Sequence, residues 1–149
     1  MWKRVLVLPV LLLLGYSPAS TQDQKAAPAP PPAEFKIPPD VAKQPNPVKP
    51  TPESIAKGKR IYGFDCAVCH GKDGDGKGDL ASSMIAKMAD FRDSSSLKDR
   101  TDGELFYIIK NGKGEMPGEG DRAKGDDTWN LVNYVRSFAK KDSAAKDKP

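Results

Sequence analysis

The sequence predicts a small all-α domain with about three main helices and long glycine-rich loops. Three segments carry apolar residues at helical spacing, with helix start or stop signals at their ends. No segment alternates apolar and polar residues for more than a few positions, as a half-buried strand would. The helical segments fall within residues 52–141, about 90 of the 149 residues, which is enough for one small domain and too few for two.

The first predicted helix begins after Thr51, which is a candidate N-cap, with Pro52 at the first helical position. Ile55, Gly58 and Tyr62 then follow at helical spacing, so they share one face of this helix.

Two further helices follow. Thr101 and Glu104 fit a capping box, and Asn111 with Gly112 forms a typical C-terminal signal, which bounds the second helix. The apolar residues of the second helix are Leu105, Phe106, Ile108 and Ile109. The third helix is predicted from residue 126 or 127 to residue 139. Its broad apolar stripe consists of Trp129, Leu131, Val132, Tyr134, Val135 and Phe138.

The first 19 residues are typical of a secretory signal peptide. Lys3 and Arg4 precede a ten-residue apolar run, and the small residues Ser17 and Ala19 follow it, which indicates cleavage near Ala19. The run is about half of the 20 apolar residues that a membrane-spanning helix needs. An uncleaved N-terminal anchor is the alternative, and both interpretations predict export of the folded domain.

Residues 20–51 are predicted to be a proline-rich disordered linker, and residues 142–149 a charged C-terminal tail. Ten of the 14 prolines fall between Pro28 and Pro52. Proline at this density removes backbone donors and favours an extended chain, so the linker serves as a spacer or as a tail left after processing.

The charge distribution gives no indication of nucleic-acid binding. The net charge is +4, but residues 52–141 carry sixteen Lys or Arg against fifteen Asp or Glu. A nucleic-acid-binding domain usually has a dense basic stripe, whereas acids and bases alternate here.

The two Cys and the single His of the chain, which can bind a cofactor or metal, lie together in one pentapeptide, Cys66-Ala67-Val68-Cys69-His70. This C-x-x-C-H pattern is that of covalent c-type haem attachment. Two thiols at this spacing reach the two vinyl groups of one porphyrin, and the following His is held under the iron as its proximal ligand. A disulfide would leave the His without a role, and a zinc site would need a carboxylate as its fourth ligand, because the chain has only two Cys and one His.

The chain around this motif resembles the class I cytochromes c, and the resemblance covers residues 52–141. In that family the first helix carries a Gly and an aromatic residue eight and four positions before the first haem Cys; here these are Gly58 and Tyr62. The last helix of the family crosses them through an apolar residue and a Tyr, which match Leu131 and Tyr134. The resemblance implies a small cytochrome c-like fold, with about three main helices wrapped around one covalently bound haem c.

The sixth ligand of the iron would be Met84, Met88, Met116, a Lys, or none. Met84 and Met88 are spaced i, i+4, a pattern more typical of core packing than of ligation. Met116 precedes Pro117 in a polar loop that resembles the distal segment of the family, in which a Met followed by Pro is presented to the iron. The resemblance therefore implies His70 and Met116 as the axial ligands.

The sequence does not identify the backbone carbonyl that accepts a hydrogen bond from the His70 ring. Many relatives place a Pro in the loop after the motif, near the backbone carbonyl that orients the proximal His. No Pro stands between Pro52 and Pro117 here, which leaves residues 80–83 as candidate acceptors.

His/Met ligation raises the reduction potential and fills the position where oxygen or peroxide would bind. We therefore expect an electron-transfer protein rather than an enzyme. The expected protein is an exported, periplasmic, monomeric, monohaem cytochrome c, soluble or tethered to the membrane through its N-terminus. It would carry single electrons between redox proteins in a respiratory-type chain.

Two alternatives belong to other functional classes. The first is a haem enzyme or gas-binding domain with an open sixth site; the absence of a second His to act as a distal acid or base argues against it. The second is a haem subunit fixed in a larger dehydrogenase or oxidase, with which a proline-rich linker is compatible.

Overall fold

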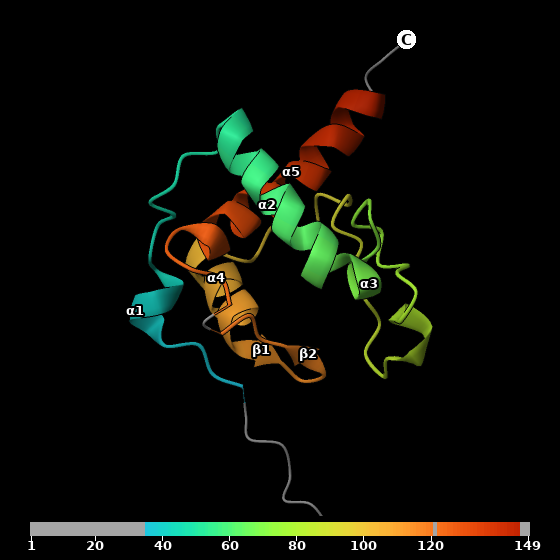
Figure 1. The fold of residues 1–149 in the computed structure, drawn as a ribbon, viewed down its shortest axis with the longest axis horizontal. Coiled ribbons are helices and arrows are strands. Elements are labelled where there is room, and N and C mark those ends of the chain that lie inside the picture. The colour runs from blue at the N-terminus through green and yellow to red at the C-terminus, as the bar shows by residue number, and fades with distance from the viewer. Residues whose placement is uncertain (1–34, 121, 147–149) are drawn as a thin grey trace, which may run out of the picture. The chain divides into compact units, whose positions relative to one another are not determined.

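The computed structural model describes residues 35–120 and 122–146, with side-chain surroundings up to residue 139. The predicted signal peptide of residues 1–19 and residues 20–34 of the predicted linker lie outside the described residues. The described part is mostly helical, with two very short strands (Figure 1). Its elements are α1 (Pro39–Ala42), α2 (Pro52–Asp65), α3 (Ala67–His70), the 3-10 turn η1 (Ala81–Ser83), α4 (Asp102–Asn111), β1 (Gly112–Lys113), β2 (Met116–Pro117) and α5 (Asp127–Lys146).

The start signals of the first two long helices are confirmed. The hydroxyl of Thr51 accepts a hydrogen bond from the backbone N–H of Ser54 at 3.2 Å, which caps α2. At α4 the capping box is complete: Thr101 accepts from the N–H of Glu104, and the Glu104 carboxylate accepts from the N–H of Thr101. Gly112, at φ 80°, ends α4 as predicted.

The third long helix, α5, continues to Lys146, beyond the predicted end at residue 139. Residues 140–146 contain neither Gly nor Pro, and Lys and Ala among them are good helix formers. The predicted charged tail therefore begins as helix, and residues 147–149 lie outside the described residues.

The fold centres on the crossing of α2 and α5 (Figure 1). A Cβ added to Gly58 would overlap the carbonyl oxygen of Asn130 and would lie 2.8 Å from the Cβ of Tyr134. Tyr62 packs edge-on against Tyr134, with ring centroids 5.2 Å apart, and Leu131 is fully buried. The predicted contact between these two helices is confirmed.

Most of the buried apolar side chains belong to α5, and the rest come from α2 and α4. The core consists of Tyr62, Leu105, Ile109, Trp129, Leu131, Val132, Tyr134, Val135 and Phe138. Trp129 stacks on Phe106 with centroids 4.1 Å apart, which joins α4 to α5. This core is small, as expected for a domain of about 90 residues.

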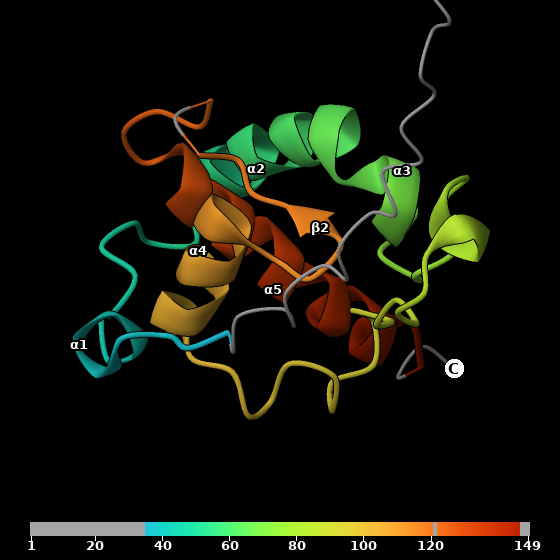
Figure 2. The same cartoon turned by 90° about the horizontal axis from the view of Figure 1, so that it is seen from below.

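Residues 35–51, which we call the N-terminal segment, differ from the predicted disordered linker. This segment includes α1, which lies beside α4 on the side away from α3 (Figures 1 and 2). The Asn46 amide donates to Asn133 Oδ1 at 2.9 Å, and the Asn133 amide donates to the Val48 carbonyl at 2.9 Å. Thr101 donates its hydroxyl to the carbonyl of Ala42 at 2.5 Å. Proline restricts the local backbone, but these long-range hydrogen bonds hold the segment against the domain.

Candidate haem-binding site

The C-x-x-C-H motif begins where α2 ends. Cys66 is the C-cap of α2 and the N-cap of α3, a single turn that ends at His70. The backbone N–H groups of Cys69 and His70 both donate to the Cys66 carbonyl, at 3.1 and 2.9 Å. Both thiols are free and half-buried, so the two cysteines are not joined in a disulfide. The helical turn brings both cysteines and the histidine to one cavity.

This cavity has a volume of about 420 Å³. It is bordered by the motif, by residues 84–89 and by the β1–β2 hairpin with the residues that follow it. Its lining consists of Asp65, Cys66, Val68, Cys69, His70, Leu80, Met84, Lys87, Met88, Ala89, Ile108, Lys113, Glu115, Met116, Pro117 and Glu119. The volume lies in the range of roughly 300–1,000 Å³ that is typical of ligand and cofactor pockets.

The cavity brings together all of the sequence-predicted site residues, including Met116. Met116 lies on β2, which pairs antiparallel with β1 so that Met116 is opposite Lys113. A Cβ on Gly118 would lie 2.5 Å from the carbonyl carbon of Asn111 and 2.7 Å from the backbone nitrogen of Gly112. The backbone around Met116 is therefore packed closely against the end of α4.

Met84 and Met88 also line the cavity, and both are half-buried. Their i, i+4 spacing does not reflect a helix, because residues 84–90 form an irregular segment after η1. They nevertheless lie on the same cavity as Met116, so three thioether side chains border it.

Glu115 joins two of the segments around the cavity. Its Oε2 accepts hydrogen bonds from the backbone N–H groups of Ile85, at 2.8 Å, and Ala86, at 3.1 Å. This carboxylate therefore links the residue next to Met116 with the segment that carries Met84. This role of Glu115 could not be predicted from the sequence, because no local pattern signals a contact across 30 residues.

The loop after α3 folds back on the motif and satisfies its carbonyl groups. The N–H of Gly76 donates to the His70 carbonyl at 2.9 Å, and the N–H of Gly78 donates to the Cys69 carbonyl at 3.2 Å. Tyr62 donates its hydroxyl to the Gly71 carbonyl at 2.8 Å, which ties the loop to the helix crossing. A Cβ on Gly78 would lie 2.6 Å from the Ala67 carbonyl oxygen, so this close return depends on glycine.

The His70 side chain borders the cavity and has one unpartnered nitrogen. Its Nδ1 is buried and has no hydrogen-bond partner among the described residues, so none of residues 80–83 accepts from it. Burial lowers the pKa of His70, which favours the neutral imidazole, the form that binds iron. The His70 ring stacks on Phe91 instead, with centroids 4.8 Å apart and planes at 25°.

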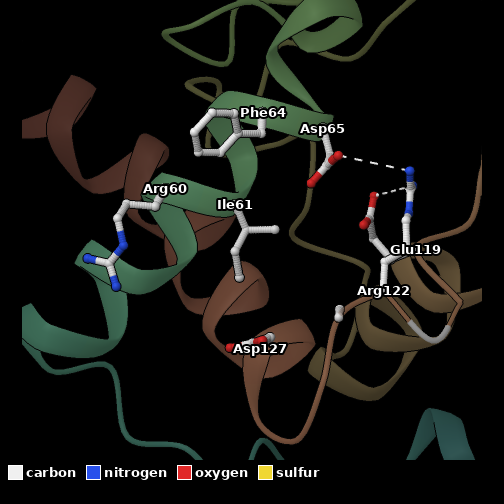
Figure 3. Close-up of a pocket in the computed structure, with 8 residues that line it drawn as sticks. Arg60, Ile61, Phe64, Asp65, Glu119, Arg122 and Asp127 are labelled. Atoms are coloured by element: carbon white, nitrogen blue, oxygen red, sulfur yellow. Dashed lines mark hydrogen bonds and ion pairs between the residues drawn. The ribbon is translucent and has the colours of Figure 1, made fainter.

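Charged side chains flank the Cys66 end of the cavity. Arg122 bonds to Glu119 at 3.1 Å and lies 4.0 Å from Asp65, while Phe64 points away from this cluster and is 87% exposed (Figure 3). Burial, with the nearby Glu119 and Asp65 carboxylates, raises the pKa of the Cys66 thiol to about 12. Burial and Asp65 also raise the pKa of Glu119. The raised pKa of Cys66 favours the protonated form of its thiol at neutral pH.

Two properties of the described residues concern membranes and metal ions. Among the helices of this part of the chain, none is long and apolar enough to span a bilayer. The same residues contain no group of three or more His, Cys, Asp or Glu side chains able to hold a metal ion. By contrast, the two thiols, the neutral imidazole and the predominantly apolar cavity beside them fit a covalently attached haem.

The helix crossing and the C-x-x-C-H turn at a predominantly apolar cavity define a class I c-type cytochrome, a protein that carries haem c covalently. Residues 53–135 match the family cytochrome c oxidase, cbb3-type, subunit III, and the chain belongs to this family.

Similar proteins include small cytochromes and parts of larger proteins. Cytochrome c6 of Diacronema lutheri is 32% identical over 87 residues, covering 57% of this chain and 96% of that protein. The quinohemoprotein alcohol dehydrogenase ADH IIB of Pseudomonas putida is 33% identical over 122 residues, which is 80% of this chain but 16% of the dehydrogenase. A chain of the reducing HAO-like protein complex of Kuenenia stuttgartiensis has a TM-score of 0.56 and 28% identity. That likeness covers 62% of this chain and 46% of the other.

Proposed function

We propose that this chain is a single-electron carrier whose haem iron is held between the imidazole of His70 and the thioether of Met116. Cys66 and Cys69 are the proposed points of covalent attachment. The observation that supports the proposal most strongly is that all four side chains line one cavity, although Met116 comes from a separate hairpin. Membership of a c-type cytochrome family supports it as well.

Haem bound in this site supplies a one-electron couple, the ferric and ferrous states of its iron. A thioether is a soft ligand, so Met116 would stabilise the ferrous state and raise the reduction potential. With His70 as the other axial ligand, both axial positions would be filled. Oxygen and peroxide would then have no site at the iron, which favours electron transfer over catalysis.

We assign Met84 and Met88 to the wall of the cavity rather than to the iron. The backbone of Met116 is held by strand pairing with Lys113 and by close glycine packing, whereas Met84 and Met88 lie in an irregular segment. A ligand on a fixed backbone changes its position little between redox states. That property suits a carrier, because less rearrangement accompanies each electron transfer.

Replacing each of the three methionines by alanine in the haem-loaded protein tests this assignment. We expect Met116→Ala to give a high-spin ferrous protein that binds carbon monoxide and has a lower potential than the wild type. Met84→Ala and Met88→Ala are the matched controls, and we expect both to remain low-spin with near-native potentials. An unchanged spectrum and potential in Met116→Ala would contradict the assignment, and loss of low-spin character in a control would transfer the ligand role to that residue.

We also propose that the protein is exported, by means of residues 1–19, and exchanges electrons with redox proteins outside the cytoplasm. The charged stretch, apolar run and small residues of this segment support export. Intact mass measurement of the periplasmic protein tests it: a chain that starts near Ser20 is expected. A periplasmic protein that retains residue 1 would indicate an uncleaved anchor instead.

A haem domain fixed to a larger oxidoreductase is the second candidate function. The match to the Pseudomonas putida dehydrogenase favours it, because that match spans 122 residues and therefore more than residues 53–135. Size-exclusion chromatography of a native extract separates the two functions: a free carrier elutes at the mass of the monomer, and a fixed subunit co-elutes with a partner.

A further inference from the structure

Among the described residues, the His70 side chain is held by ring stacking and by no hydrogen bond. The buried Nδ1 atom has no partner, including the backbone carbonyls of residues 80–83. The Phe91 ring lies nearly parallel to the imidazole, with centroids 4.8 Å apart and an interplanar angle of 25°. Phe91 is therefore the neighbour whose ring faces the plane of the imidazole.

Phe91 is itself fixed on two sides. Its backbone N–H donates to the Gly74 carbonyl at 2.7 Å, within the loop that follows the haem motif. Its ring also stacks on Phe138 of α5, with centroids 6.5 Å apart and planes at 27°. A Cβ on Gly74 would lie 2.8 Å from the Phe138 ring, so the loop approaches that ring closely.

Phe138 connects this stack to the centre of the fold. It is 3% exposed and packs against Tyr62 and Tyr134, with centroids 5.3 and 4.7 Å away. The row His70–Phe91–Phe138 therefore starts at the cavity and ends in the α2–α5 crossing. A ring supported in this way resists rotation, because interior side chains pack at high density.

We propose that Phe91 is a positioning residue that sets the plane of the His70 imidazole, in place of a hydrogen bond from Nδ1 to a backbone carbonyl. The inference rests on the proposed role of His70 as the proximal ligand. It has an electronic consequence, because a hydrogen bond from the second ring nitrogen raises the basicity of a ligating histidine. Without that bond His70 is a weaker donor, which favours the ferrous state.

The plane of an axial imidazole controls how unpaired electron density spreads over a ferric haem. The proton NMR shifts of the four haem methyl groups report that distribution. We expect Phe91→Leu, which removes the flat face, to change the order or the spread of the four methyl shifts. Phe91→Tyr keeps the ring, and Phe91 is half-buried, so this variant is expected to retain the wild-type pattern.

Phe106→Leu is the matched control, because it removes a stacked aromatic ring that packs against the same core but does not line the haem cavity. We expect it to lower the melting temperature and to leave the methyl shifts unchanged. Wild-type shifts in Phe91→Leu, or equal changes in Phe91→Leu and Phe106→Leu, would overturn the inference. So would a change in Phe91→Tyr as large as that in Phe91→Leu.

A measurement on the unmodified holoprotein keeps the inference testable if Phe91→Leu does not fold. The nitrogen-15 and proton shifts of the His70 Nδ1–H group are expected to be those of a group without a hydrogen bond. Signals of a strongly hydrogen-bonded Nδ1–H would overturn the inference. A wild-type holoprotein in which His70 does not bind iron would refute both the proposed function and the role of Phe91. Low-spin haem with wild-type methyl shifts in Phe91→Leu would refute only the role of Phe91.

Discussion

At Gly58 the absence of a side chain decides how closely two helices approach. A Cβ there would overlap the Asn130 carbonyl oxygen and lie within 3 Å of the Tyr134 side chain. Because the first of these atoms belongs to the α5 backbone, a rotamer change cannot relieve the overlap. The two helices would have to separate, and the Tyr62–Tyr134 contact would weaken with them.

Gly58→Ala is therefore expected to destabilise the holoprotein, although alanine is the better helix former. Overpacking of this kind costs about 1–3 kcal/mol. Gly63→Ala is the matched control in the same helix, because nothing lies within 4 Å of a Cβ at Gly63. We expect it to be neutral or to stabilise by about 0.5–1 kcal/mol. Denaturant unfolding measures both, and a Gly58→Ala protein as stable as the control would contradict the close crossing.

Residues with local signals could be predicted from the sequence, and residues with distant partners could not. The spacing of Cys66, Cys69 and His70 within one helical turn already indicates their common target. Glu115 and Phe91 carry no such signal. The Glu115 carboxylate contacts backbone groups 30 and 29 positions away, and the Phe91 ring contacts the His70 ring of α3. Only the folded chain brings these groups together.

At the scale of elements, the N-terminal segment is part of the folded domain. Asn133, on α5, donates to the Val48 carbonyl of this segment and to the Ser54 hydroxyl of α2. Asn46 donates to Asn133 in turn, and Val48 packs against the core. The buried Asn133 amide therefore joins the N-terminal segment, α2 and α5.

Asn46→Ala and Asn133→Ala form a double-mutant cycle for this contact. Each single change is expected to cost about 1–3 kcal/mol, because it leaves buried polar groups without partners. The double variant is expected to cost less than the sum, with a coupling of about 0.5–3 kcal/mol. Denaturant unfolding of the holoprotein supplies the four free energies. Purely additive costs would show that the segment does not dock through this pair.

The starts of α2 and α4 could be predicted because helix caps are local contacts. The outer boundaries of the folded domain could not be predicted. Thr51 and Thr101 cap their helices through groups three residues away. The docking of the N-terminal segment depends on Asn46 and Asn133, which are 87 residues apart, so proline content alone predicted a linker. The extension of α5 to Lys146 differs from the prediction, because a charged composition is typical of frayed ends as well as of exposed helices.

At the scale of the whole domain, the described residues form a small core beside a cavity that a bound haem would fill. The core residues come mainly from α2, α4 and α5, while the cavity is bordered by the haem motif, residues 84–89 and the hairpin. Haem c stays attached to its cysteines when the chain unfolds, so it would stabilise the fold through the apolar contacts that only the folded cavity makes with it. The same arrangement brings His70 and Met116 to one site, which is the central claim of the proposed function.

The most direct test of that claim is a spectroelectrochemical titration of the wild-type holoprotein, followed by exposure of the ferrous form to carbon monoxide. We expect a single one-electron transition at a clearly positive potential, low-spin spectra in both redox states, and no carbon monoxide binding. A high-spin ferrous spectrum, or a negative potential together with carbon monoxide binding, would contradict that claim.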